Sequence, residues 1–153
     1  ETLDQEARRL FSRLASATRG CDSRSGEQTI PFRIVQAFLA ACQQSQRALI
    51  LDGVDLQGGD FSGLNLQGAS LEGANLAICN FSRAVLQGVN LAGANLQGAS
   101  LKDTKLQNAN LCGSNLYDVS LQGADLTGAR LEDITLSNLP HFAAHTDNFT
   151  GVQ

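Results

Sequence analysis

The sequence predicts an all-β solenoid, and two patterns in the middle of the chain carry that prediction. Eighteen consecutive positions spaced five apart, from Leu51 to Leu136, hold sixteen Leu and two Phe. A helix would rotate successive members by about 140°, and a strand would point them to opposite sides, so neither element can bury them together. Gly, Asn or Asp stands two residues after sixteen of the eighteen, and these residue types tolerate a positive φ. The chain therefore turns once in every five residues.

The series of eighteen central residues is the predicted structural core. Eight Ala stand two positions before its members, on the same side of an extended backbone, so both series point inward. The position after each member carries mostly Gln, Glu, Lys, Ser or Ala and is expected to face solvent. The predicted core comprises Leu51, Leu56, Phe61, Leu66, Leu71, Leu76, Phe81, Leu86, Leu91, Leu96, Leu101, Leu106, Leu111, Leu116, Leu121, Leu126, Leu131 and Leu136.

The repeats resemble the pentapeptide-repeat family, whose consensus A-(D/N)-L-X-X is read here as ANLQG at Ala94–Gly98 and ADLTG at Ala124–Gly128. Within the family, the chain most resembles the cyanobacterial and plant-organelle members, which are short columns with helical ends. The resemblance implies a right-handed, quadrilateral parallel β-helix with four pentapeptides, and therefore 20 residues, in each coil. Residues 49–138 would then form about four and a half coils.

A period of 20 residues predicts which side chains stack on neighbouring coils. Phe61 and Phe81 are 20 apart and should stack, with small residues at Gly59 and Cys79 leaving room for the rings. Two side-chain ladders are expected on the outer wall, one of Asn75, Asn95 and Asn115 and the other of Gln67, Gln87 and Gln107.

The flanking segments differ in composition from the repeats and are predicted to cover the ends of the column. Residues 1–48 are expected to form an N-terminal α-helical pair, because apolar residues recur there at helical spacing and Thr2 and Gln5 fit a capping box. In residues 139–153, Pro140 breaks the period, and a short helical cap followed by a tail is expected. Solenoid ends need such covers because open coils expose apolar side chains and unpaired edges.

The four cysteines can be sorted by their place in the repeat. Cys79 falls in the inward series and Cys112 in the outward one, so the wall separates them and they cannot be bridged. Cys21 and Cys42 both lie in the N-terminal cap, where a disulfide is geometrically possible and two unpaired thiols are the alternative. A bridge would indicate an oxidising compartment. Together with the absence of Met, it favours an extracytoplasmic location, in a periplasm or thylakoid lumen, over the cytoplasm.

No motif indicates an enzyme, a cofactor or a metal site. His141 and His145 are four apart, with Asp147 nearby, but two histidines in a terminal cap are more often polar cap residues. The cysteines lack Cys-x-x-Cys spacing, and the glycines recur at predicted turns instead of in a phosphate-binding loop before a helix. A column filled with Leu, Phe and Ala offers no concave, water-poor pocket for acid–base catalysis. We therefore expect no catalytic residue, no cofactor and no metal.

The charge distribution limits the kind of partner. Residues 1–48 have a net charge of +2, and residues 49–139 have a net charge of −5. The acidic column argues against direct binding of nucleic acid, which needs a basic footprint, and leaves a basic protein partner open. No apolar run has the 18 or more residues of a membrane span.

Four acidic residues form a candidate docking strip. Asp52 and Glu72 are 20 apart and outward, and Glu132 and Asp133 lie lower on the same side. The two interpretations are a solvated face that aids solubility and a strip that docks a basic surface. We predict a non-enzymatic interaction or structural module, monomeric or dimerised end to end, that presents flat, mildly acidic faces to an unidentified protein partner. The alternative that the family resemblance implies is a DNA-mimicking binder of DNA gyrase, of the quinolone-resistance type, although this chain is shorter and less acidic.

Overall fold

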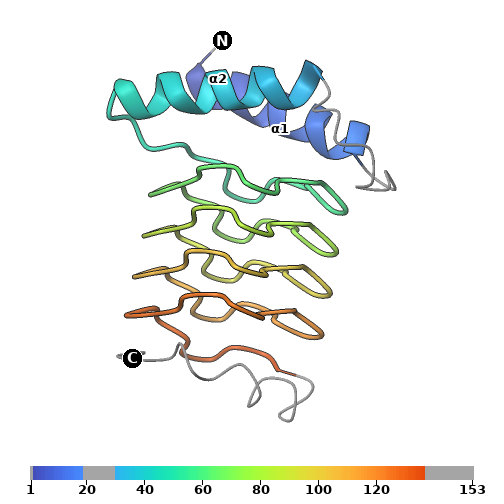
Figure 1. The fold of residues 1–153 in the computed structure, drawn as a ribbon, viewed down its shortest axis with the longest axis vertical. Helices are drawn as coiled ribbons and strands as arrows, with labels where there is room; N and C mark the ends of the chain where they lie inside the picture. The colour runs from blue at the N-terminus through green and yellow to red at the C-terminus, as the bar shows by residue number, and fades with distance from the viewer. Residues whose placement is uncertain (1, 19–29, 137–153) are drawn as a thin grey trace.

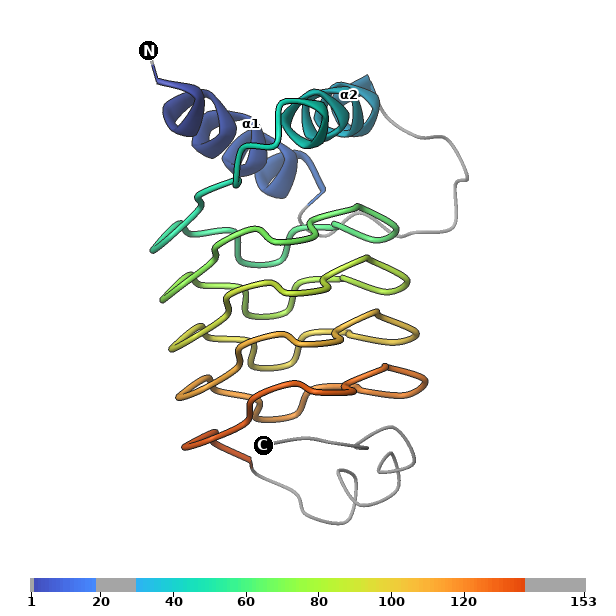
Figure 2. The same cartoon turned by 90° about the vertical axis from the view of Figure 1, so that its left-hand side faces the viewer.

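The computed structural model describes residues 2–18 and 30–136, with side chains described for 2–16 and 36–136. Its elements are helix α1 (Leu3–Thr18), helix α2 (Ile30–Gln44) and a column of short coils that follows them. The coils stack along one axis, and both helices lie across the N-terminal end of the stack (Figures 1 and 2). The closing helix expected in 139–153 lies outside the described residues.

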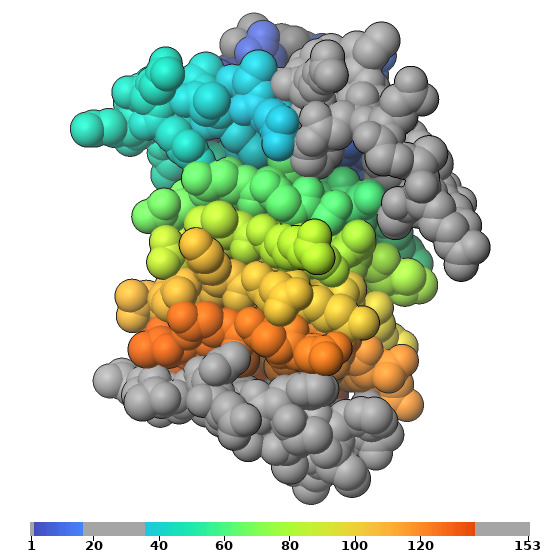
Figure 3. All heavy atoms as spheres, viewed as in Figure 1, coloured from blue at the N-terminus to red at the C-terminus, as the bar shows by residue number. Residues whose placement is uncertain are grey.

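Each coil of the column takes 20 residues. Every parallel β-bridge within the described column joins a residue to the one 20 positions later, from Ile50 with Ser70 to Asn115 with Thr135. Each pentapeptide contributes one bridging residue and then turns, so the column is built from single-residue bridges instead of long strands. Four pentapeptides therefore close one coil, and successive coils form a continuous wall (Figure 3).

Backbone hydrogen bonds between coils recur with the five-residue period. In the repeat around Leu96, the amides of Leu96 and Gly98 donate to carbonyls of the next coil (2.9 Å each). The amide of Asn95 donates to the previous coil (2.9 Å), and the amide of Ala99 closes the turn onto the Leu96 carbonyl (2.9 Å). The backbone of this repeat thus satisfies four of its five amides.

The fifth amide explains why Asp and Asn precede so many central residues. The side-chain oxygen of that residue accepts from the amide two positions later, as Asn95 Oδ1 does from Gln97 N (3.2 Å). Because an unpaired backbone amide is costly, this contact completes the hydrogen bonding of the repeat. The same contact recurs at Asp55, Asp60, Asn65, Asn75, Asn80, Asn90, Asn110, Asn115 and Asp125.

The interior of the column is apolar. The first sixteen central residues, from Leu51 to Leu126, are buried. The last two, Leu131 and Leu136, which belong to the last coil that the structure describes, are only half-buried. The side chains two positions before the central residues complete the filling, among them buried Ala94 and Ala99.

Three phenylalanine rings form a stack that begins in α1. The ring centroids of Phe61 and Phe81 are 5.3 Å apart, which confirms the predicted stacking, and the ring of Phe11 lies 5.9 Å from that of Phe61. Gly59 makes room for this arrangement. A Cβ atom at Gly59 would lie 2.5 Å from the Phe61 ring and 3.1 Å from the Cα atom of Ala15 in α1. Helix α1 therefore packs directly on the first coil.

Both helices are also held by other specific contacts. In α2, which packs against α1, Leu39 is buried in the same cluster as the central residues of the column. The side-chain amide of Gln43 donates to the carbonyl of Asn65 (3.3 Å). At the start of α1, the backbone amide of Thr2 donates to Oε1 of Gln5 (3.0 Å), which is one arm of the predicted capping box.

The outer wall forms one of the two predicted ladders. Asn115 donates to Asn95 (3.2 Å) and Asn95 donates to Asn75 (3.3 Å), which confirms the asparagine ladder. The predicted glutamine ladder fails at Gln107, whose side-chain amide donates to the carboxylate of Asp125 (2.5 Å) and whose oxygen has no partner. A carboxylate accepts more strongly than an amide oxygen, and the longer Gln side chain can reach it.

The turns need a left-handed backbone. The second residue after a central residue has a positive φ, for example 67° at Gly98 and 58° at Asn108. Ile78 (φ 58°) and Arg83 (φ 61°) also occupy this position, although a β-branched or long side chain is strained there. These two exceptions stand on consecutive turns of one coil.

Candidate interaction surface

The candidate docking residues Asp52 and Glu72 lie on adjacent coils, on a side of the column that we call the acidic face. Asp52 Oδ1 accepts hydrogen bonds from the Ser70 hydroxyl (2.5 Å) and from the backbone amide of Glu72 (3.1 Å). Ser70 stands where most repeats have Asp or Asn, so Asp52 supplies the acceptor that the repeat of Ser70 lacks. One oxygen of this carboxylate therefore has a structural role.

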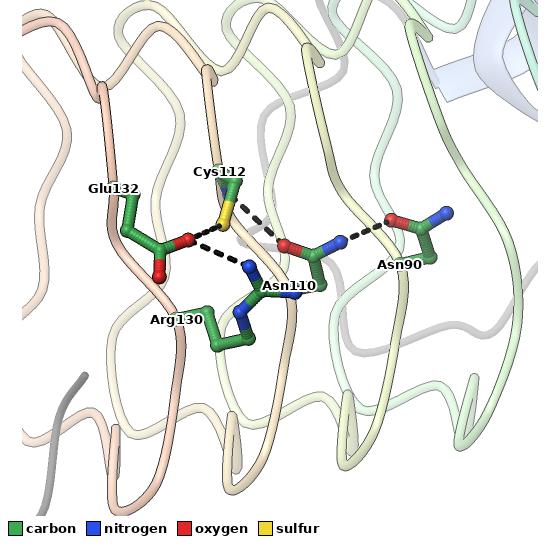
Figure 4. Close-up of polar contacts among 5 residues, drawn as sticks. All are labelled: Asn90, Asn110, Cys112, Arg130 and Glu132. Atoms are coloured by element: carbon green, nitrogen blue, oxygen red, sulfur yellow. Dashed lines mark hydrogen bonds and ion pairs between the residues drawn. The ribbon is translucent and has the colours of Figure 1, made fainter.

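A chain of hydrogen bonds continues down the acidic face. Asn90 Nδ2 donates to Glu72 Oε2 (3.0 Å), and Asn110 Nδ2 donates to Asn90 Oδ1 (3.1 Å). Asn110 Oδ1 in turn accepts from the backbone amide of Cys112 (3.2 Å), as Figure 4 shows. The first two links join polar groups on adjacent coils, and the third joins two groups of one repeat, so the face is a connected polar network.

The network ends at Glu132, on the last described coil. Its Oε2 atom accepts from the Arg130 guanidinium (2.8 Å) and from the thiol of Cys112 (2.7 Å; Figure 4). Glu132 stands three coils from Glu72, or about 14 Å at the usual spacing between strands. Asp133 follows at an exposed turn with φ 56°. The four candidate residues therefore form two separate acidic groups, one of which is paired with an arginine.

The contacts around Glu132 shift the pKa values of two groups. The hydrogen bond from Cys112, followed by the hydrogen bond from Arg130, lowers the pKa of Glu132 from its ordinary value of 4.5. The same Cys112–Glu132 hydrogen bond, together with burial, raises the pKa of Cys112 above its ordinary value of 9.0. Cys112 is thus a thiol that donates to a carboxylate near neutral pH, and it lacks the lowered pKa of a nucleophilic cysteine.

The other described cysteines are buried. Cys79 lies in the inward series, and its thiol donates to the carbonyl of Leu56 (3.0 Å). Cys42 of α2 is a free thiol whose pKa is raised by burial. Cys21 lies outside the described residues, so a bridge between Cys21 and Cys42 stays a prediction.

Two exposed apolar residues were not singled out from the sequence. Ile78 is 65% exposed and Tyr117 is 48% exposed. Both follow a residue of the asparagine ladder along the chain, on the side of the column adjacent to the acidic face. Ile78 carried a signal in the sequence, because it and Arg83 are the departures from the Gly, Asn and Asp of the turn position. Tyr117 carried none, since its position varies among the repeats.

Neither a metal centre nor a membrane span is found in the part of the chain that the structure describes. Among residues 2–18 and 30–136, no group of three or more His, Cys, Asp and Glu residues could hold a metal ion. The helices of the same ranges are too short or too polar to cross a membrane. His141, His145 and Asp147 lie outside these ranges.

The geometry defines a filled β-solenoid whose usable surface is its outer wall. The chain belongs to the pentapeptide-repeat family. The family model for pentapeptide repeats matches in 8 copies, over residues 50–77, 79–116 and 94–133. Membership of this family implies a right-handed, quadrilateral β-helix for such a column. No curated protein matches the chain.

Several solved structures are similar to this chain. The pentapeptide repeat protein alr5209 from Nostoc PCC 7120 is 26% identical over 76% of this chain and 93% of its own, with a TM-score of 0.59. Rfr23 from the cyanobacterium Cyanothece 51142 is 30% identical over 59% of this chain and 64% of its own, with a TM-score of 0.41. HetL, involved in heterocyst differentiation regulation in Nostoc sp. PCC 7120, is 40% identical over 60% of this chain and 40% of its own, with a TM-score of 0.45.

Proposed function

We propose that this chain is a non-enzymatic interaction module, a rigid pentapeptide-repeat column that presents flat, mildly acidic faces to a protein partner. The filled interior carries this proposal. Leu, Phe and Ala occupy the inside of the described coils, so a partner can contact the column only from outside. Catalysis needs a desolvated pocket with convergent polar groups, and such a wall does not supply one.

The proposed architecture serves that role. Residues 49–138 form about four and a half coils, and the helical pair of residues 1–48 caps the first of them. Burial of Phe11 against Phe61 supports this cap, because it covers apolar side chains at the end of the column. Residues 139–153 supply the opposite cap. The module acts as a monomer or as an end-to-end dimer.

The acidic face is the proposed docking surface. Glu72 and Asp133 are exposed, and Glu72 belongs to the hydrogen-bond network that fixes the polar groups of this face. A rigid surface loses little conformational entropy on binding, which favours recognition of a partner with a complementary basic patch. The side chains of Arg130 and Glu132 neutralise each other, so Asp52 and Glu72 would carry the attraction.

A charge-reversal experiment tests this proposal. The full chain and its variants Glu72→Lys and Gln97→Lys are immobilised, and a captured partner is identified and its binding titrated. Both changes lie on the exposed wall, but only the first reverses the acidic face, so we expect saturable binding that Glu72→Lys weakens at least tenfold and Gln97→Lys leaves unchanged. Equal binding by both variants would refute docking at this face. Inhibition of gyrase supercoiling by the wild-type chain would favour the DNA-mimicking alternative instead.

A further inference from the structure

A hollow of about 390 Å³ lies on the side of the column opposite the acidic face, two pentapeptides further along each coil. It extends over three successive coils at their turns. Its lining residues are Ser62, Gly63, Ser82, Arg83, Lys102 and Asp103.

Positive charge is concentrated at this hollow. Arg83 and Lys102 lie on adjacent coils and are joined through the backbone, where the Arg83 amide donates to the Lys102 carbonyl (2.8 Å). Lys105 stands three residues further along the coil. Within the described residues, neither Arg83 nor Lys102 has an ion pair, whereas Arg130 is paired with Glu132. An otherwise acidic column thus keeps two unneutralised cations side by side.

One oxygen of the carboxylate in the lining lies against the next coil toward the C-terminus. The Oδ1 atom of Asp103 occupies the space beside Gly123, 2.1 Å from where a Cβ atom of that glycine would stand. Gly123 belongs to the next coil toward the C-terminus, whereas Arg83 belongs to the preceding one. Asp103 therefore lies against the turn of Gly123. Since neither Arg83 nor Lys102 has an ion pair within the described residues, their donors are available to another acceptor.

The backbone at Arg83 is a second, independent sign that its side chain is needed. Its φ of 61° lies in the left-handed region, where a non-glycine residue costs free energy, and most repeats place Gly, Asn or Asp there. Its side chain is exposed, so burial does not offset this strain. Ile78 has the same strained backbone without a charge, so the strain at Arg83 supports a binding site only together with the hollow and the two cations.

We propose that this hollow binds a phosphate group, either as the free anion or as a phosphate monoester. A guanidinium and an ammonium group supply charge-assisted donors, and Arg in particular matches the oxygen geometry of phosphate. The hydroxyls of Ser62 and Ser82 add neutral donors. The Ser82 and Ser100 hydroxyl oxygens are 2.9 Å apart, and when Ser100 donates to Ser82, the Ser82 proton is free for the ligand. A tetrahedral dianion accepts from several directions, which suits donors from successive coils better than a planar carboxylate does.

Titration of the ¹⁵N-labelled full chain tests this site. Inorganic phosphate, O-phosphoserine and serine are added separately, with sodium chloride holding the ionic strength constant. We expect saturable amide shifts at Ser62, Ser82 and Lys102, with a dissociation constant of roughly 1–10 mM, for the two phosphate compounds and none for serine. Tighter binding of O-phosphoserine would identify the ester as the ligand, and tighter binding of inorganic phosphate the free anion. Absence of saturable shifts with both compounds would overturn the proposal.

Variants localise the effect to the hollow. Arg83→Gln and Lys102→Gln should each weaken binding at least fivefold, whereas Arg130→Gln removes a cation from the opposite side and should leave binding unchanged. Arg83→Gly should also lose binding while melting at or above the wild-type temperature, because glycine relieves the left-handed strain. This variant separates loss of the ligand from loss of the fold. Equal weakening by Arg130→Gln would show a general charge effect and refute a site at the hollow.

Discussion

The ring of Phe11 in α1 packs on the ring of Phe61 in the first coil, with 5.9 Å between their centroids. Phe61 in turn stacks on Phe81, so one aromatic stack runs from the helix into the column. Phe11 and Phe61 are 1% and 0% exposed, respectively. The helix and the first coil therefore share one core, and loss of the contact should destabilise both.

Phe11→Ala should lower the free energy of unfolding by about 3–5 kcal/mol, because it leaves a cavity at the junction of α1 and the column. Urea unfolding followed by circular dichroism measures this change. Arg13→Ala alters an exposed residue of the same helix and should have an effect within about 0.5 kcal/mol. A loss below about 1 kcal/mol for Phe11→Ala would mean that α1 is not anchored by this ring.

Asn95→Ala should destabilise the column by about 2 kcal/mol. Asn95 accepts from the Gln97 amide and from Asn115, and it donates to Asn75, so its removal leaves partners on three coils without their bonds. Thermal unfolding checks the value, with Gln97→Lys on the exposed wall as the control that should change little. Similar melting temperatures for the two variants would contradict a structural role of the ladder.

The repeat itself was predictable from the sequence because each position of the pentapeptide faces either the core or the solvent in every repeat. A leucine in every coil side must be buried, and a period of 20 then sets which rings and amides are neighbours, as Phe61 with Phe81 and Asn95 with Asn115 show. The reason for Asp or Asn before the central residue was missed. In each repeat one backbone amide has no backbone acceptor, and the Asp or Asn side chain accepts from it. Only the hydrogen-bond pattern of the structure shows which amide this is.

The candidate site was less predictable than the repeat. The sequence placed Asp52, Glu72 and Glu132 outward, but it could not show that Ser70, Asn90 and Arg130 hold their carboxylates. Those contacts depend on the side-chain rotamers of the outward residues, and the repeat pattern does not determine these rotamers. Ile78 was visible as a departure from the turn pattern, yet its meaning depends on the positive φ and the exposure that the structure supplies.

Ile78→Gly should stabilise the protein by about 1 kcal/mol. A β-branched residue in the left-handed region costs roughly 1–2 kcal/mol, and the side chain is 65% exposed, so little burial is lost with it. Its Cγ1 atom lies over Gly98, 3.7 Å from where a Cβ atom of that glycine would stand. Gly98→Ile, with the same strain introduced one coil away, is the matched control and should destabilise. Destabilisation by Ile78→Gly would mean that the contact over Gly98 outweighs the strain.

The last coil should become less stable in acid because of Glu132. The folded-state pKa of this carboxyl is lowered from 4.5, so its contribution to stability is present above pH 4.5 and is lost as the pH falls through the lowered value. Glu132→Gln should flatten the dependence of the melting temperature on pH in this acidic range. Gln97→Glu places a carboxylate at another exposed wall position, between Ala77 and Tyr117 of the neighbouring coils, and serves as the control. An unchanged pH profile in Glu132→Gln would show that the pKa of Glu132 does not differ between the folded and the unfolded chain.

The thiol of Cys112 should react slowly with iodoacetamide in the wild-type chain and faster in Glu132→Gln. Only the thiolate is nucleophilic, and the hydrogen bond to Glu132 raises the pKa of Cys112, so less thiolate is present at any pH below that value. Replacing Glu132 removes both that bond and the neighbouring negative charge, which lowers the pKa of Cys112 and shifts its alkylation profile to lower pH. Peptide mapping resolves Cys112 from buried Cys42 and Cys79, which should stay protected in the folded protein. If Glu132→Gln leaves the profile unchanged, the Cys112–Glu132 contact does not persist in solution, and the acidic-face network ends at Asn110.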